Sequence, residues 1–239
     1  MSIASFIAIL VAGMAAGTIN TVVGSGSLIT FPTLVTLGYA PLVANVSNNI
    51  GLVPGSVSGM YGYRKELKGQ GRRLLRLAPM SGLGGLTGSI LLLALPGTVF
   101  KKVVVVLIVV ALTLVISQPR LSKRLAVARE ASAPRDASRE VPPVLAFLVC
   151  LAGVYGGYFG AAQGIILIAV LGLFLDDHLQ RLNACKNVLA GTVNGVASIA
   201  FIISWSHIDW AVVGTIAIGS TIGGQIGARV GRALNPKVL

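Results

Sequence analysis

Charged side chains are scarce in this chain. They make up 11% of its 239 residues, whereas 54% are hydrophobic. Soluble domains carry about 25% charged residues, and they need that polar surface because apolar burial saturates with domain size. The composition therefore excludes a soluble globular protein and a disordered chain. The mean hydropathy of +0.86 indicates an all-α protein, a polytopic bundle of transmembrane helices.

Cysteines and acidic residues are also few. The two cysteines, Cys150 and Cys185, lie in apolar stretches and give neither a disulfide framework nor a metal-ligand spacing. Asp176, Asp177 and His178 resemble a metal-ligand cluster but fall in a tight turn between apolar stretches, so we do not interpret them as a metal site. No nucleophile is paired with a base at a readable spacing. We therefore expect no enzymatic activity, no metal and no cofactor.

Positive charge is abundant but confined to a few places. Of the 19 basic residues, 15 fall in the three segments 64–76, 120–139 and 229–237. Basic residues in short loops between apolar spans mark the cytoplasmic side of a membrane protein. No aromatic residues interleave with a basic face, so a nucleic-acid partner is not expected. The charge predicts a multi-pass protein of the cell membrane, with the lipid bilayer as its main surroundings.

Seven apolar stretches are long enough to cross a bilayer, and the first lacks the basic flank of a signal peptide. These spans are Ile3–Val23, Leu42–Tyr63, Leu74–Leu95, Val99–Ser117, Pro143–Phe159, Leu182–Trp205 and Trp210–Val230. Two further stretches, Ser27–Leu37 and Ile165–Leu175, are too short to cross as straight helices. Each follows a break of small residues, at 24–27 and 160–164. We expect both to be halves of broken or re-entrant helices.

The paired breaks predict an internal duplication. We expect a first repeat at 1–118, a basic cytoplasmic loop at 119–142 and a second repeat at 143–239. Aligning the breaks gives an offset of 136 residues, whereas aligning Ala44 with Ala184 gives 140. The second repeat stops short, so its last span is expected to be missing, by natural shortening or by truncation.

The loops predict that the two repeats are inverted. The loop 64–73 is strongly basic, but its counterpart 206–209 has no lysine or arginine. Matching loops therefore lie on opposite sides, with Met1 outside, provided that both short segments cross. Inverted repeats with helices broken at corresponding positions are typical of secondary transporters.

Uncharged polar residues gather on the two spans that follow the breaks. Amide and hydroxyl donors there, together with backbone N–H groups at the broken ends, suit a small oxyanion. The candidate site residues are Ser25, Gly26, Ser27, Asn45, Ser47, Asn48, Asn49, Gln163, Lys186, Asn187 and Asn194. The asparagines could instead hydrogen-bond neighbouring helices and hold the bundle together. Lys186 could be a counter-charge for the substrate or could snorkel to the interface.

At these residues the sequence resembles the sulfite exporter TauE/SafE family of membrane permeases. The matching motifs are Gly24-Ser25-Gly26-Ser27 with Pro32, Ala44-Asn45-Val46-Ser47-Asn48, the run from Tyr155 to Gly164, and Asn183-Ala184 with Lys186-Asn187. The resemblance implies a permease for small anions such as sulfite or a sulfonate, working by alternating access. The alternative hypothesis is a non-transporting subunit or assembly factor that needs a partner helix. A partner membrane subunit or a homo-oligomer fits either hypothesis.

Overall fold

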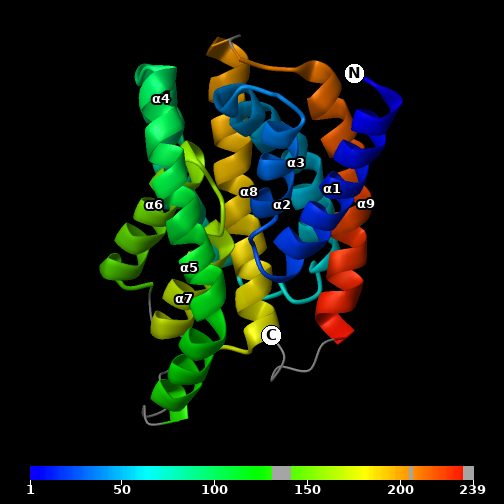
Figure 1. Cartoon of the computed structure of the whole chain (residues 1–239). Coiled ribbons are helices and arrows are strands. Elements are labelled where there is room, and N and C mark those ends of the chain that lie inside the picture. The colour runs from blue at the N-terminus through cyan, green and yellow to red at the C-terminus, as the bar shows by residue number, and fades with distance from the viewer. Residues whose placement is uncertain (131–140, 205–206, 234–239) are drawn as a thin grey trace.

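The structure, a computed structural model, describes residues 1–130, 141–204 and 207–233, with side chains left out over 118–130. Within these ranges the chain is all-helical and forms nine helices (Figure 1). In chain order they are α1 (Ile3–Val22), α2 (Ser27–Thr36), α3 (Pro41–Gly62), α4 (Gly71–Ala94), α5 (Gly97–Glu130), α6 (Pro143–Tyr158), α7 (Gln163–Phe174), α8 (Leu179–Ser204) and α9 (Trp210–Ala233).

Each apolar stretch predicted from the sequence forms one of these helices, so the expected helical membrane bundle is confirmed. Helices α1, α4, α8 and α9 and the part of α5 at Gly97–Ser117 are long and apolar enough to cross a membrane. Helix α3 is as long but carries the polar cluster, and α6 has only 16 residues. Helix α5 continues to Glu130, past the boundary at 118 where a loop was expected.

Glycine produces the two interruptions. Gly24 has a φ of +92° and Gly160 a φ of +78°, in the left-handed region where a side chain is strained. Ala162, at a φ of +61°, adopts this conformation despite its Cβ. After each turn a short helix begins, α2 at Ser27 and α7 at Gln163. These two starts are related by the offset of 136 residues that the sequence predicted.

Contacts along the helices give their directions. Gly13 lies beside Ile216 and Gly227 beside Thr18, so residue numbers rise together and α1 is parallel to α9. Helix α3 is parallel to α9 as well, because Gly51 meets Ile216 and Gly62 meets Ala228. Since α1 and α3 run the same way, the segment that contains α2 returns the chain to the side where α1 began.

The second repeat runs the other way. Helix α8 is antiparallel to its counterpart α3, since Gly191 lies beside Met60 while Ser198 hydrogen-bonds Asn49. The repeats are therefore inverted, as expected. The direction of the helices brings the end of α3 and the end of α9 to the same end of the bundle. We call this the basic end, because Arg64, Lys65 and Arg229 lie there.

The two repeats exchange helices. Helix α1 packs on α9 and α6 packs on α4, so each first helix contacts the other repeat (Figure 1). The same contacts occur twice: Gly84 faces the backbone of Cys150, and Gly223 faces that of Met14. Small residues permit this close approach of membrane helices. The result is two groups of parallel helices, α1, α3 and α9 in one and α4, α6 and α8 in the other.

Hydrogen bonds fix the register between the repeats. Ser81 Oγ donates to the Leu189 carbonyl at 3.0 Å, and Ser220 Oγ donates to the Gly51 carbonyl at 2.9 Å. The offset between Gly51 and Leu189 is 138 residues, equal to that between the first residues of α3 and α8. The expected offset of 140 residues is therefore wrong for this span, and Asn45 corresponds to Asn183.

Candidate functional site

The two helix interruptions touch each other inside the bundle. The Gly164 N–H donates to the Gly24 carbonyl at 3.0 Å. A Cβ atom on either glycine would lie closer to the other glycine's Cα than the 3.0 Å that real Cβ atoms respect. Glycine is required at both positions, because any side chain would separate the two breaks. The starts of α2 and α7 are thus held together, one from each repeat.

Helix α8 binds the end of α1 with three side chains. The Nδ2 atoms of Asn183 and Asn187 each donate to the Thr21 carbonyl at 3.2 Å. Lys186 Nζ donates to the carbonyls of Asn20 at 2.9 Å and Thr21 at 3.3 Å. The last carbonyls of a helix lack partners within the helix and carry partial negative charge, so cationic and amide donors stabilise them.

Lys186 is the only charged side chain among the fully buried polar residues of the described chain, with an exposed fraction of 0%. The expectation that it snorkels to the interface is therefore wrong. An ammonium group has three N–H donors, and two of them are used by the carbonyls. No carboxylate pairs with Lys186 among the residues whose side chains are described. Its Nζ atom therefore lies at the break of the first repeat.

Helix α3 makes the corresponding contacts. Asn45 Nδ2 donates to the carbonyl of Tyr158, the last residue of α6, at 3.0 Å. Asn48, the counterpart of Lys186, donates from Nδ2 to Ser27 Oγ at 3.2 Å and accepts from the Thr30 hydroxyl. Asn45 and Asn183 thus each bind the helix end of the opposite repeat. These residues gather around the breaks, as the sequence predicted.

Three candidate residues lie away from the breaks. Asn194 Nδ2 reaches Ser56 Oγ at 3.5 Å, and Asn49 Oδ1 accepts from Ser198 at 3.0 Å. Both contacts join α3 to α8, so they fit the interpretation that asparagines hold the bundle together. Ser47 Oγ accepts from the Asp209 N–H at 2.9 Å and ties α3 to the start of α9.

Several donors at the breaks are unused. In the described part of the chain, no partner is seen for the N–H groups of Ser25, Gly26 and Ser27, at the start of α2. Gln163, at the start of α7, is 3% exposed, and its Nε2 is buried without a partner. Unsatisfied buried donors are costly and need an explanation. An anion at the crossing of the breaks would explain them.

Sequence reasoning missed three contributors to this site. Thr21 acts through its backbone carbonyl, so no residue-type signal could reveal it. Thr30, the fourth residue of α2, donates its hydroxyl to Asn48. Tyr155 Oη donates to the Ala161 carbonyl at 2.5 Å and fixes the second break. In the sequence the run Tyr155-Gly156-Gly157-Tyr158 carries only a family resemblance, because the partner of the Tyr155 hydroxyl is a backbone carbonyl.

Comparison with known proteins gives one family over almost the whole chain. The profile of the sulfite exporter TauE/SafE family matches residues 9–239. The chain belongs to this family. It is 24% identical over 221 residues to "Probable membrane transporter protein YfcA" of Escherichia coli strain K12, covering 91% of this chain and 77% of that protein. No solved structure matches significantly.

Two other relatives carry similar names. "Probable membrane transporter protein ORF9" of a Sinorhizobium species is 26% identical over 239 residues, covering 97% of this chain and 85% of the relative. A "Probable membrane transporter protein" of Haemophilus influenzae is 26% identical over 220 residues, covering 91% and 82%. This member of the TauE/SafE family therefore belongs among membrane transporters, and its fold agrees with that assignment.

Proposed function

We propose that this TauE/SafE-family protein is a permease of the cell membrane that carries a small anion by alternating access. One observation carries the proposal. A fully buried lysine, Lys186, lies at the interrupted helices, and no carboxylate among the described side chains balances it. Intramembrane ionisable residues are costly and mark transport paths. A positive, dehydrated centre attracts an anion and repels a cation.

The donors around the breaks support an oxyanion. Lys186 has one N–H left after its two carbonyl contacts, and the Gln163 amide and the first N–H groups of α2 are unpaired. Helix N-termini carry partial positive charge and bind groups rich in acceptor oxygens. Sulfite and sulfonates each present three such oxygens. The family's description as sulfite exporters favours this class.

Transport of a defined panel tests the proposal. Purified protein in vesicles is given labelled sulfite, a short alkyl sulfonate and an uncharged sulfone of similar size. We expect saturable flux of one or both anions and none of the sulfone. Equal flux of the sulfone, or no saturable flux of either anion, would contradict the proposal.

Lys186→Gln isolates the role of the charge. Glutamine keeps an N–H donor for the Asn20 and Thr21 carbonyls but removes the positive charge, so the fold is retained. We expect anion flux to fall by at least about 100-fold, the scale of losing one charged contact in a dehydrated site. Lys102→Gln is the matched control, because Lys102 is exposed near the start of α5. Wild-type flux in Lys186→Gln would exclude the lysine from the path.

A further inference from the structure

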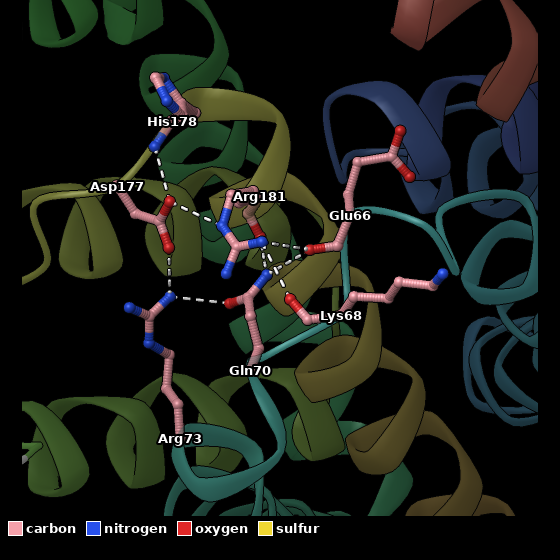
Figure 2. Close-up of polar contacts among 7 residues, drawn as sticks. All are labelled: Glu66, Lys68, Gln70, Arg73, Asp177, His178 and Arg181. Atoms are coloured by element: carbon pink, nitrogen blue, oxygen red, sulfur yellow. Dashed lines mark hydrogen bonds and ion pairs between the residues drawn. The ribbon is translucent and has the colours of Figure 1, made fainter. Parts of the chain in front are cut away.

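At the basic end, a loop of the first repeat is hydrogen-bonded to a loop of the second. The loop after α3 contributes Glu66, Lys68 and Gln70, and α4 adds Arg73 (Figure 2). The turn before α8 contributes Asp177, and α8 adds Arg181. We call these six residues the Asp177 latch. The tight turn that the sequence places at Asp177 is held in the structure by two arginines, one from α4 and one from α8.

Two ion pairs form the centre of the latch. Arg73 Nη1 lies 2.8 Å from Asp177 Oδ2, and Arg181 Nε lies 2.8 Å from Asp177 Oδ1. The Asp177 side chain is only 13% exposed. Bonds between charged groups at this distance are about twice as strong as neutral ones, and partial burial protects them from salt. The carboxylate therefore joins α4 to α8.

Backbone contacts extend the latch to the end of α3. Gln70 Nε2 donates to the carbonyls of Glu66 and Arg181, both at 2.9 Å. Arg181 Nη1 donates to the Lys68 carbonyl at 3.0 Å. Arg73 Nη1 also donates to Gln70 Oε1 at 2.7 Å. The loop that follows α3 cannot leave the start of α8 unless these bonds break.

At the opposite end of the bundle, the described residues show a hydrogen bond in place of the ion pairs. There the loop before α9 corresponds to the loop that carries Gln70, because the repeats are inverted. Among residues 207–212 and 37–47 the structure gives one cross-link between these regions, the Asp209 N–H to Ser47 Oγ at 2.9 Å, and no ion pair. Among the residues described at the two ends, only the basic end therefore carries ion pairs between its loops and helices.

We propose that the Asp177 latch is the gate of the basic end, closed in this conformation and opened once in each transport cycle. The inference rests on the proposed alternating access, in which α3 and α8 must separate at one end at a time. Asp177 acts as a positioning residue: it orients Arg181, whose Nη1 donates to the Lys68 carbonyl in the loop after α3, and it does not touch the substrate.

The α8 residue behind the gate is Ala184. It is fully buried against Tyr63 and Ala228, near the ends of α3 and α9, whereas Cys185 packs on α4, α6 and α7. Cys150 lies on α6 and is partly exposed. These are the two cysteines of the chain. In a Cys150→Ala, Cys185→Ala background, the rate at which a maleimide modifies an Ala184→Cys variant measures opening of the basic end between α8 and the ends of α3 and α9, and it needs no substrate.

The test compares latch variants with a matched neighbour. Asp177→Asn and Arg73→Gln are each expected to raise the labelling rate at position 184 about tenfold or more, since each removes a charge-assisted bond that orients Arg181 or Gln70 in the closed state. Arg72→Gln is the control, because Arg72 is exposed and makes no bond or ion pair with the described residues. Asp177→Glu keeps the charge and is expected to label at nearly the wild-type rate.

Three results would overturn the gate. One is a wild-type labelling rate in both Asp177→Asn and Arg73→Gln. Another is an equal acceleration in Arg72→Gln, which would make the effect one of loop charge. The third is an equal acceleration at Cys150, measured in a Cys185→Ala background, which would show general loosening of the fold. Failure of anion flux in wild-type vesicles would instead count against the proposed function, so the two failures are distinguishable.

Discussion

The N–H of Gly164 donates to the carbonyl of Gly24 at 3.0 Å, and this bond joins interrupted helices from two inverted repeats. It places the starts of α2 and α7 together in the interior of the bundle. Lys186 lies at the same break and binds the end of α1. The site is therefore defined by backbone geometry as much as by side chains, and this geometry gives the first prediction.

Gly24→Ala and Gly164→Ala are each expected to destabilise the protein by at least about 3 kcal/mol, at the upper end for overpacked sites. Each new Cβ would clash with the backbone of the other glycine, and Gly24 also has a φ of +92°. Thermal unfolding in detergent measures the effect. Gly195→Ala is the control: a Cβ there meets nothing within 4 Å, so a gain of roughly 0.5–1 kcal/mol is expected for a helical position. Equal stability of Gly24→Ala and Gly195→Ala would refute the contact.

Ser81 and Ser220 occupy equivalent positions in the two repeats, so we expect their hydrogen bonds to contribute equally to the free energy of unfolding. Ser81→Ala and Ser220→Ala each remove one buried hydrogen bond to the backbone of the opposite repeat. We expect each to cost about 1 kcal/mol of unfolding free energy, with the two values agreeing within about 0.5 kcal/mol. Thr87→Ala is the comparison, because Thr87 is exposed and bonds its own helix at Leu83. A large difference between the two serines would mean that the repeats are not energetically equivalent.

We expect acid to weaken the ion pairs of Asp177, and we expect pH changes around neutrality to leave them unchanged. Burial alone raises the pKa of the Asp177 carboxyl, but the bond from Arg73, the His178 N–H and the charges of Arg181 and Arg73 outweigh burial. The pKa therefore lies below its ordinary value of 3.8. A lowered carboxyl pKa adds stability above the unfolded-state pKa, and this stability is lost as the pH falls through the folded-state pKa.

The stability difference between wild type and Asp177→Asn is therefore expected to be constant from about pH 6 to about pH 8, because the carboxylate is ionised in both states there. It is expected to shrink only below the ordinary pKa of 3.8. Thermal unfolding across a pH series measures it. A difference that already disappears near pH 6 would show that another titrating group controls the latch.

The sequence predicted the helices well because their signals are local. Apolar length and the glycine breaks placed α2 and α7 without any knowledge of their partners. The hydrogen-bond partners of each side chain, in contrast, depend on which helix of the other repeat packs beside it. Lys186 illustrates this: its bonds to Asn20 and Thr21 arise only because α8 crosses the end of α1. Asp177 was missed for the same reason, since Arg73 is far away in sequence. The offset of 138 residues could be fixed only by paired contacts such as Ser81 with Leu189.

The exchange of helices between the repeats separates the unit of repetition in the sequence from the unit of packing in the structure. Helix α9 is encoded with the second repeat but is bonded along its length to α1 and α3, and α4 is likewise bonded to α6 and α8. The group formed by α1, α3 and α9 takes helices from both halves of the sequence. Cutting the chain at its central linker would therefore yield two fragments that each lack the neighbours they pack on, and only their co-expression could restore a working protein.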